Sequence, residues 1–96
     1  MLELDNLKQQ LSSYDNTLKE LKSSLDMDNK ANRIQELERE MEGPDFWNDA
    51  EKSTAKTKEL KSLKDDLLTF SKLEELYGDI EAYIELGNEE EDDKRV

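Results

Sequence analysis

The sequence predicts an all-α fold, either an elongated antiparallel bundle of three helices or a coiled-coil-like domain. Two observations lead to this prediction. Leucines recur three and four residues apart along most of the chain, which is the pattern of helices that bury one stripe. Charged residues make up 42% of the sequence, whereas it has only three glycines and one proline, so little interrupts a helix. At 96 residues the chain is expected to form a single small domain.

The first helix is expected over about residues 2–25. Its apolar residues form a heptad seam, and such a seam needs a helical partner. The members of the seam are Leu4, Leu7, Leu11, Tyr14, Leu18, Leu21 and Leu25. The pattern stops at Asp26 and Asp28, which are good amino-terminal caps, so a second helix is expected over about residues 28–42.

A turn follows the second helix, because Gly43 and Pro44 cannot both lie inside a helix. Phe46 and Trp47 come directly after them, and Trp47 is the only tryptophan of the chain. We expect Pro44, Phe46 and Trp47 to form a structural anchor that packs on the flanking helices. The alternative is an exposed aromatic pair that docks on a partner.

The third helix is expected to be the longest, over about residues 49–87, with Asn48 or Asp49 as its cap. Its apolar stripe is wide, which predicts that it faces two neighbours. Gly78 lies inside this helix. We expect the helix to continue through Gly78, and a break there would instead make a fourth helix.

The helical domain is thus expected to comprise residues 1–88. The strongly acidic residues 89–96 have no apolar side chain before the last, so we expect a disordered tail or a linker to further domains.

The formal charge of −12 is uneven, with −8 in residues 74–96 and +2 in residues 50–73. Such acidity disfavours direct binding of DNA or of an RNA backbone as the main activity. The start of the third helix is the one place where an anionic partner would be favoured. Its candidate contacts are Lys56, Lys58, Lys61 and Lys64, and a solvated helix face is the alternative.

The chain has no histidine and no cysteine, which excludes disulfides, the usual zinc sites and the common pairs of nucleophile and base. It has no glycine-rich phosphate loop, no apolar run that could span a bilayer and no signal-peptide pattern at its start. We therefore expect no catalytic residue, no metal or cofactor site, no membrane segment and a cytoplasmic location.

Several stretches of the sequence resemble the amino-terminal domain of bacterial peptide chain release factor 2, a family of class I release factors. They are Leu25-Asp26-Met27-Asp28, the helix from Arg33 to Glu42, Pro44-Asp45-Phe46-Trp47-Asn48-Asp49, the lysine and leucine repeat that follows, and Ile84-Glu85-Leu86 with its acidic run. The resemblance covers about residues 25–93, and its most specific part is the stretch from Pro44 to Asp49.

The resemblance implies a piece of a translation termination factor that recognises the stop codons UAA and UGA and triggers hydrolysis of peptidyl-tRNA. This chain contains neither Gly-Gly-Gln, the family's hydrolysis motif, nor Ser-Pro-Phe, its codon-reading motif, so we expect neither activity from it alone. The resemblance also implies a peripheral position near the stalk base of the large ribosomal subunit and a link to the GTPase that recycles release factors. A monomer is expected.

The alternative from another class is a cytoplasmic coiled-coil module that acts in oligomerisation or as a scaffold. This reading explains the heptads and the charge, but a rod of this kind has no need for the turn at Gly43 and Pro44.

Overall fold

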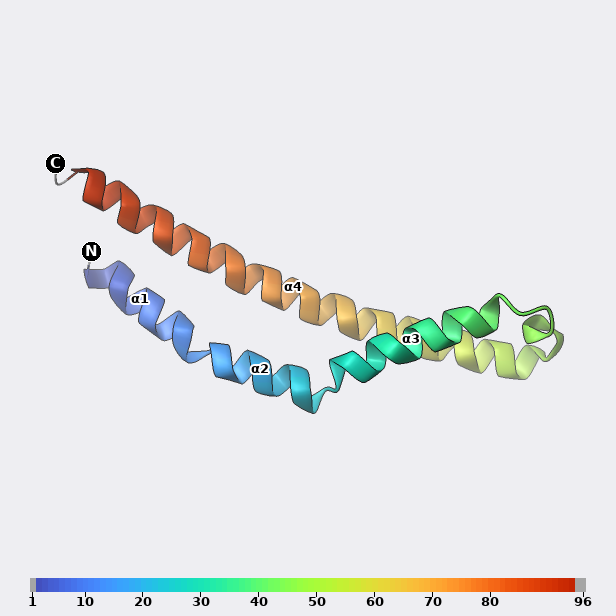
Figure 1. Ribbon diagram of the computed structural model, residues 1–96. Helices are drawn as coiled ribbons and strands as arrows, with labels where there is room; N and C mark the ends of the chain where they lie inside the picture. Colours follow the sequence, from blue (N-terminus) through green and yellow to red (C-terminus); the bar gives the residue numbers. More distant parts are fainter. Residues whose placement is uncertain (1, 95–96) are drawn as a thin grey trace. The chain divides into compact units, whose positions relative to one another are not determined.

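The computed structural model describes residues 2–94, and every regular element in this range is a helix. The α-helices are α1 (Leu2–Ser13), α2 (Asp15–Ser24), α3 (Met27–Met41) and α4 (Ala50–Lys94), and a 3₁₀ helix, η1 (Phe46–Asn48), precedes α4 (Figure 1). The all-α class that the sequence predicts is confirmed. The chain divides into two compact units: unit 1 comprises Met1–Ser24 and Ser71–Val96, and unit 2 comprises Leu25–Phe70.

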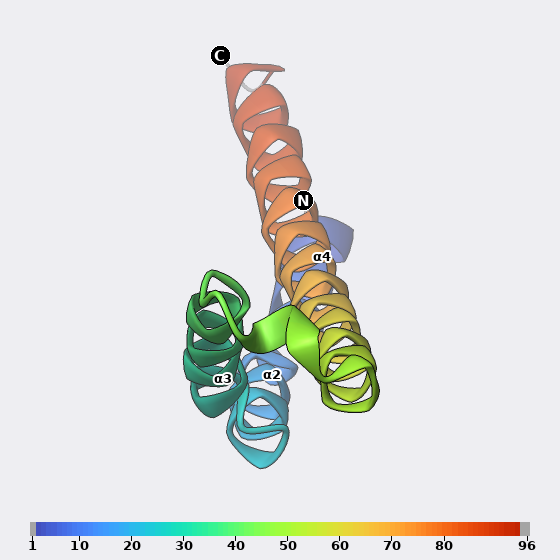
Figure 2. The same cartoon turned by 90° about the vertical axis from the view of Figure 1, so that its right-hand side faces the viewer.

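Unit 2 pairs α3 with the first part of α4, and Figure 2 views this pair from the end that carries the connecting turn. Met27 and Leu37 of α3 and Leu60 and Phe70 of α4 are buried, and Leu37 has no exposed surface. A helix of 15 residues such as α3 is marginal in water on its own. Burial of its apolar side against α4 is therefore what stabilises it.

Local hydrogen bonds form at both ends of α3, but the Asp26 side chain does not cap the backbone at its start and Asp28 lies inside the helix, so the expected aspartate cap is not observed. The helix begins after Asp26, which has left-handed backbone angles (φ 55°, ψ 50°) and whose carboxylate accepts a hydrogen bond from the side chain of Asn29 at 2.7 Å. At the other end the amide of Gly43 bonds to the carbonyl of Glu40, three residues back, at 3.0 Å. Such short-range bonds use carbonyls that would otherwise lack a partner at a helix end.

Unit 1 pairs α1 and α2 with the second part of α4. Leu4 of α1 lies so close to Gly87 of α4 that an added Cβ would come within 2.9 Å of Leu4 Cδ1. Further along, the hydroxyl of Tyr77 in α4 donates to the carbonyl of Leu11 in α1 at 3.0 Å. Because later residues of α1 meet earlier residues of α4, the two segments are antiparallel.

The expected single first helix is interrupted at Tyr14, which separates α1 from α2. The amide of Tyr14 bonds to the carbonyl of Leu11 at 3.0 Å, only three residues back, and the same carbonyl accepts the Tyr77 hydroxyl. A side chain that inserts into the ladder of helix hydrogen bonds interrupts it. Two residues of low helix propensity, Ser12 and Ser13, come directly before the break. The regular heptad spacing of the leucines continues through them and so predicts an unbroken helix.

The last helix is longer than expected. α4 runs through Gly78, where an added side chain would meet nothing within 4 Å, so the expected continuity is confirmed. It then continues to Lys94, so residues 89–94 are helical and not the disordered tail that their composition predicts. Residues 95–96 lie outside the described range. Extension of an existing helix adds one hydrogen bond for each residue fixed, which favours continuation over a new start.

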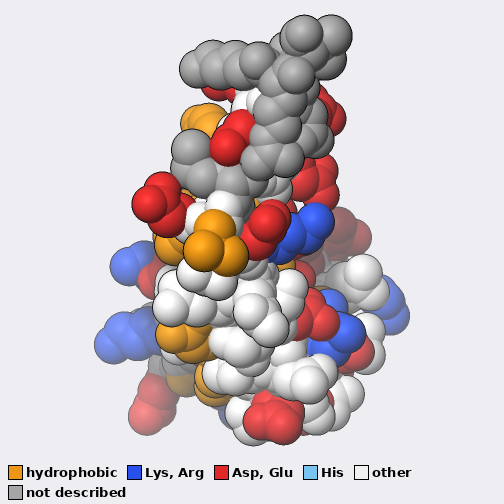
Figure 3. Space-filling model, turned by 90° about the vertical axis from the view of Figure 1, so that its left-hand side faces the viewer, with side chains coloured by type: hydrophobic (Ala, Val, Ile, Leu, Met, Phe, Trp, Pro, Cys, Tyr) orange, Lys and Arg blue, Asp and Glu red, His pale blue; other side chains and the backbone are white. Residues whose placement is uncertain are grey.

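Unit 1 buries less apolar surface than unit 2. Of its described hydrophobic side chains only Ile84 is buried. The large side chains left exposed include Leu7, Tyr14, Leu76, Ile80 and Tyr83. Figure 3 shows hydrophobic side chains at the surface among acidic ones on one face of the molecule. The wide stripe of α4 is thus used in different stretches, against α3 in unit 2 and against α1 and α2 in unit 1.

Leu37→Ala should lower the free energy of unfolding by about 2–5 kcal/mol, because it removes a completely buried side chain and leaves a cavity. Leu68→Ala is the matched control in the same unit, since Leu68 is 54% exposed, and it should cost less than about 1 kcal/mol. Urea unfolding followed by circular dichroism measures both. Equal losses for the two variants would contradict the packing of α3 on α4.

Tyr77→Phe removes the hydroxyl that bonds to Leu11, so its unfolding midpoint should be lower than that of the wild type at pH 7. Burial and then the carboxylates of Glu81 and Asp15 raise the pKa of Tyr77 above its ordinary value of 10.0. A raised pKa stabilises the fold while the phenol is neutral, and this contribution is lost as the pH rises through the folded-state pKa. The difference in unfolding midpoint between the wild type and Tyr77→Phe should therefore become smaller above pH 10.0.

Urea titrations at a series of pH values measure this difference. Tyr83→Phe is the control, because Tyr83 is 73% exposed, and it should match the wild type throughout. A difference in midpoint between Tyr77→Phe and the wild type that stays constant across the alkaline range would contradict the raised pKa of Tyr77.

Candidate functional site

The turn between α3 and α4, residues 43–49, is the candidate functional site, and we call it the turn surface. Its backbone is held by short-range bonds: the amide of Phe46 bonds to the carbonyl of Gly43 at 3.4 Å and that of Asn48 to Asp45 at 3.1 Å. The Asn48 side chain also donates to the Asp45 carboxylate at 3.3 Å. These contacts form η1 and leave little freedom in the turn.

Asp49 connects the turn to α4. Its carboxylate accepts a hydrogen bond from the amide of Lys52 at 3.1 Å, which caps the first turn of the helix. The expectation that Asn48 or Asp49 caps this helix is confirmed for Asp49. Because the cap fixes where α4 begins, it also fixes how the preceding aromatic residues are presented.

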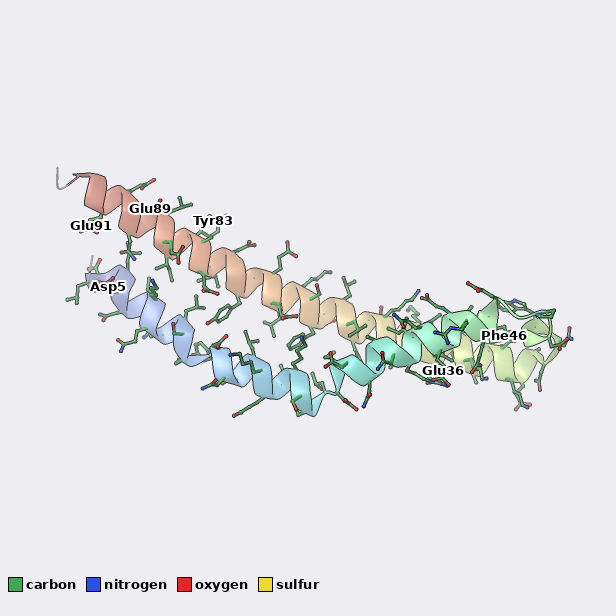
Figure 4. The ribbon with its side chains drawn as sticks, in the orientation of Figure 1. Asp5, Glu36, Phe46, Tyr83, Glu89 and Glu91 are labelled. Carbon is green, nitrogen blue, oxygen red and sulfur yellow. The ribbon has the colours of Figure 1, made fainter. Side chains whose placement is uncertain are left out.

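The two aromatic rings of the turn have different surroundings. Phe46 is half-buried and lies where the end of α3 meets the start of α4 (Figure 4). Trp47 is 60% exposed, so the expectation that it forms part of a buried anchor is wrong for this residue. Pro44 is exposed as well. The rings of Phe46 and Trp47 meet edge to face, with centroids 4.7 Å apart and an interplanar angle of 83°. Phe46 is thus the ring that packs, and it holds Trp47 facing solvent.

A cleft of about 420 Å³ adjoins the turn. It is lined by Glu40, Gly43, Pro44, Asp45, Phe46, Asp49, Lys52, Ser53 and Lys56. Ser53 is buried, and its hydroxyl donates to the carbonyl of Ala50 at 3.1 Å. The cleft therefore combines one aromatic wall with carboxylate and ammonium groups at its margin.

The turn surface is acidic. Residues 42–51 carry four carboxylates, those of Glu42, Asp45, Asp49 and Glu51, and no basic side chain. All four residues are exposed. The lysine repeat of α4 begins only at Lys52, after the turn.

Two of the four candidate lysines face α3 and take part in ion pairs. Lys56 pairs with Glu40, and Lys64 Nζ lies 2.8 Å from Glu38 Oε1. The carboxylates that α3 brings opposite these two lysines come from a different helix, so the lysine repeat alone does not reveal them. These two side chains connect the helices of unit 2.

Lys58 and Lys61 are exposed, and neither belongs to an ion pair within the described part of the chain. At about 100° per residue, Lys58 lies roughly opposite to the buried Leu60 on α4, and Lys61 lies on the flank, about 100° from Leu60. The structure thus separates the four candidate lysines into two pairs on different faces of α4.

Arg33 connects α3 to α4 by a two-point contact. Its Nε and Nη2 atoms both donate to the carboxylate of Glu59 at 2.9 Å, and Nη1 lies 3.2 Å from Glu36. The hydrogen bonds from Arg33 lower the pKa of Glu59 below its usual value, and those to Glu59 raise the pKa of Arg33. A two-point contact of this kind fixes geometry as well as adding energy. With Lys30–Asp66 at 3.0 Å, it sets the register of the helix pair.

No group of three or more acidic, histidine or cysteine side chains that could hold a metal ion occurs among the described residues. In the same range, none of the helices is long and apolar enough to cross a membrane.

Trp47→Ala should change the free energy of unfolding by less than about 1 kcal/mol, because most of the ring is already in water. Phe70→Ala is the matched control in unit 2, since Phe70 is buried, and it should cost about 3–5 kcal/mol. Because Trp47 is the only tryptophan, acrylamide should quench the fluorescence of the native and the urea-unfolded chain to similar extents. Strong protection in the native chain would show a buried ring.

Comparisons with known proteins agree with the resemblance seen in the sequence. The family model of the PCRF domain matches residues 30–96. Peptide chain release factor 2 of Staphylococcus epidermidis is 37% identical over 92 residues, which cover 96% of this chain and 25% of that protein. The protein of the same name from Clostridium perfringens is 36% identical over 98 residues, which cover the whole chain and 27% of that protein.

For Haemophilus influenzae the corresponding protein is 34% identical over 93 residues, which cover 97% of the chain and 26% of that protein. The chain thus spans about a quarter of the length of the curated relatives it matches. No solved structure matches it significantly. Because the family model covers more than half of the chain and the similarity to release factor 2 extends along its length, the chain belongs to the PCRF domain family.

Proposed function

We propose that this chain is the amino-terminal helical domain of a translation termination factor and acts as a contact module. The observation that carries the proposal is the similarity to peptide chain release factor 2, which extends over 96% of the chain in the Staphylococcus epidermidis relative. Release of the peptide at UAA and UGA is proposed for the whole protein. The absence of Gly-Gly-Gln and Ser-Pro-Phe from this chain supports a role in contact and not in codon reading or hydrolysis.

The proposed partner is the ribosome, at the region of the stalk base on the large subunit, with the GTPase that recycles release factors as a second partner of the full-length protein. The proposal places the protein in the cytoplasm, as a monomer, and includes no membrane or DNA contact. An overall charge of −12 supports a peripheral position over one deep in ribosomal RNA, because phosphates repel carboxylates.

Within this proposal, Lys58 and Lys61 are the lysines available to approach ribosomal RNA. Both are exposed, whereas Lys56 and Lys64 are engaged with carboxylates of α3. Of the four candidate lysines, the proposal therefore assigns the contact to the two that form no ion pair with α3.

Reversal of both charges, Lys58→Glu with Lys61→Glu, should reduce recovery of the chain with 70S ribosomes by about tenfold at low salt, with an unchanged unfolding midpoint. Pelleting through a sucrose cushion measures the recovery. Lys8→Glu with Lys22→Glu is the matched control, because it makes the same charge change at exposed positions of α1 and α2. An equal loss in the control would indicate a general charge effect, and a wild-type chain that never pellets with ribosomes would contradict the proposed function.

A second candidate function is oligomerisation or a scaffold role, and one observation favours it. Unit 1 leaves Leu7, Leu76, Ile80 and Tyr83 exposed, which a helical partner would cover. Light scattering across a range of protein concentrations separates the two functions. A monomer at all concentrations supports the termination factor, and a dimer that grows with concentration supports the scaffold.

A further inference from the structure

We propose that the turn surface docks a segment of another protein that presents an arginine or lysine side chain, with Trp47 and the flanking carboxylates as the contact. This proposal goes beyond the ribosomal role, because it concerns a different surface from Lys58 and Lys61 and commits to a protein partner. It is carried by three features of the turn: an exposed and ordered indole, four exposed carboxylates in residues 42–51 without a basic side chain among them, and a cleft beside the turn.

The first feature is the exposed indole. Trp47 is 60% exposed in a protein that has no other tryptophan, although a side chain of this size gains much from burial. The rings of Trp47 and Phe46 meet edge to face with centroids 4.7 Å apart, η1 shapes the backbone of the turn, and Asp49 caps the start of α4. An aromatic ring that is ordered before binding loses little entropy on docking, which is the property of an interface anchor.

The second feature is charge. Glu42, Asp45, Asp49 and Glu51 surround the ring in sequence, and no basic residue lies between Arg39 and Lys52. One oxygen of Asp45 accepts from Asn48 and one of Asp49 accepts from Lys52, so each carboxylate retains a second oxygen for a partner. A cation can therefore contact the face of the indole and a carboxylate together. The same carboxylates repel a phosphate backbone, which favours a protein partner over RNA.

The third feature is the cleft of about 420 Å³ next to the turn, whose lining includes Phe46, Asp45 and Asp49. Of the two cations in its lining, Lys56 is already paired with Glu40, and Lys52 is exposed. Trp47 does not line the cleft, so the cleft and the indole offer adjoining contacts to one segment. A long aliphatic stem that ends in a positive charge can lie along the Phe46 wall while its charged end reaches the carboxylates. Arginine and lysine have this form.

A nuclear magnetic resonance titration of the whole chain tests the proposal, because Trp47 supplies the only indole N–H signal. The probes are a glycine and serine peptide that carries arginines, the same peptide with uncharged citrulline in their place, and poly(U) RNA. The arginine peptide should produce saturable shifts at the Trp47 indole and at Gly43. The citrulline peptide and the RNA should not.

The variant for this test is Asp45→Asn with Asp49→Asn, which removes two charges and keeps side chains that can bond to Asn48 and cap α4. It should weaken binding of the arginine peptide by about tenfold. Glu89→Gln with Glu90→Gln is the matched control, since it removes two exposed carboxylates from the end of α4, and its affinity should equal that of the wild type.

Trp47→Leu, followed at Gly43, should weaken binding several-fold, because leucine keeps an apolar side chain but has no aromatic face. Three results would overturn the proposal: shifts that do not saturate, equal weakening by the two double variants, or the same shifts with poly(U). The unfolding midpoint of each variant, measured in parallel, separates loss of the contact from loss of the fold.

Discussion

The packing of α3 on α4 around Leu37 is the interaction on which the rest of unit 2 depends. Leu37 has no exposed surface, and α3 is too short to persist in water without such burial. The two-point contact between Arg33 and Glu59 and the pair Lys30–Asp66 then fix which turn of α3 faces which turn of α4. Apolar burial supplies most of the stability, and the ion pairs supply the register, because exposed pairs contribute little energy.

The register of α3 against α4 determines how the turn between them closes. With both helices held, the short connection between them must close within a few residues, and it does so through η1 and the cap at Asp49. Phe46 fills the space where the helices end, so Trp47, the next residue, is directed to solvent. The exposed indole and the acidic margin are therefore consequences of one constraint, the closure of the α3–α4 pair.

Unit 1 depends less on apolar burial than unit 2 does. Its helices are antiparallel, but of its described hydrophobic side chains only Ile84 is buried, and a close approach occurs where Gly87 admits Leu4. The bond from the Tyr77 hydroxyl to Leu11 coincides with the interruption of the helix at Tyr14. At the interruption a polar contact between the helices accompanies the change in the backbone, whereas the exposed apolar residues of this unit contribute little to its packing.

The sequence by itself determined the helical class, the second helix to within a residue of its bounds, the turn at Gly43, a cap at Asn48 or Asp49 and the family resemblance. These features depend on residues near one another in the chain: the spacing of leucines, the backbone limits of glycine and proline, and the preference of aspartate for helix starts. The prediction of a disordered tail is wrong for residues 89–94, because an acidic composition predicts disorder but does not end a helix that has already formed.

Tertiary structure decided the break at Tyr14, the exposure of Trp47 and which of the candidate lysines form ion pairs. The first and the last depend on residues distant in sequence: Tyr77 bonds to Leu11, and Glu40 and Glu38 pair with Lys56 and Lys64. The exposure of Trp47 depends on the closure of the turn, where Phe46 and not Trp47 lines the cleft beside the helix ends. Helical periodicity places a side chain on a face of its own helix, but only the register between helices decides which charge, hydroxyl or ring lies opposite.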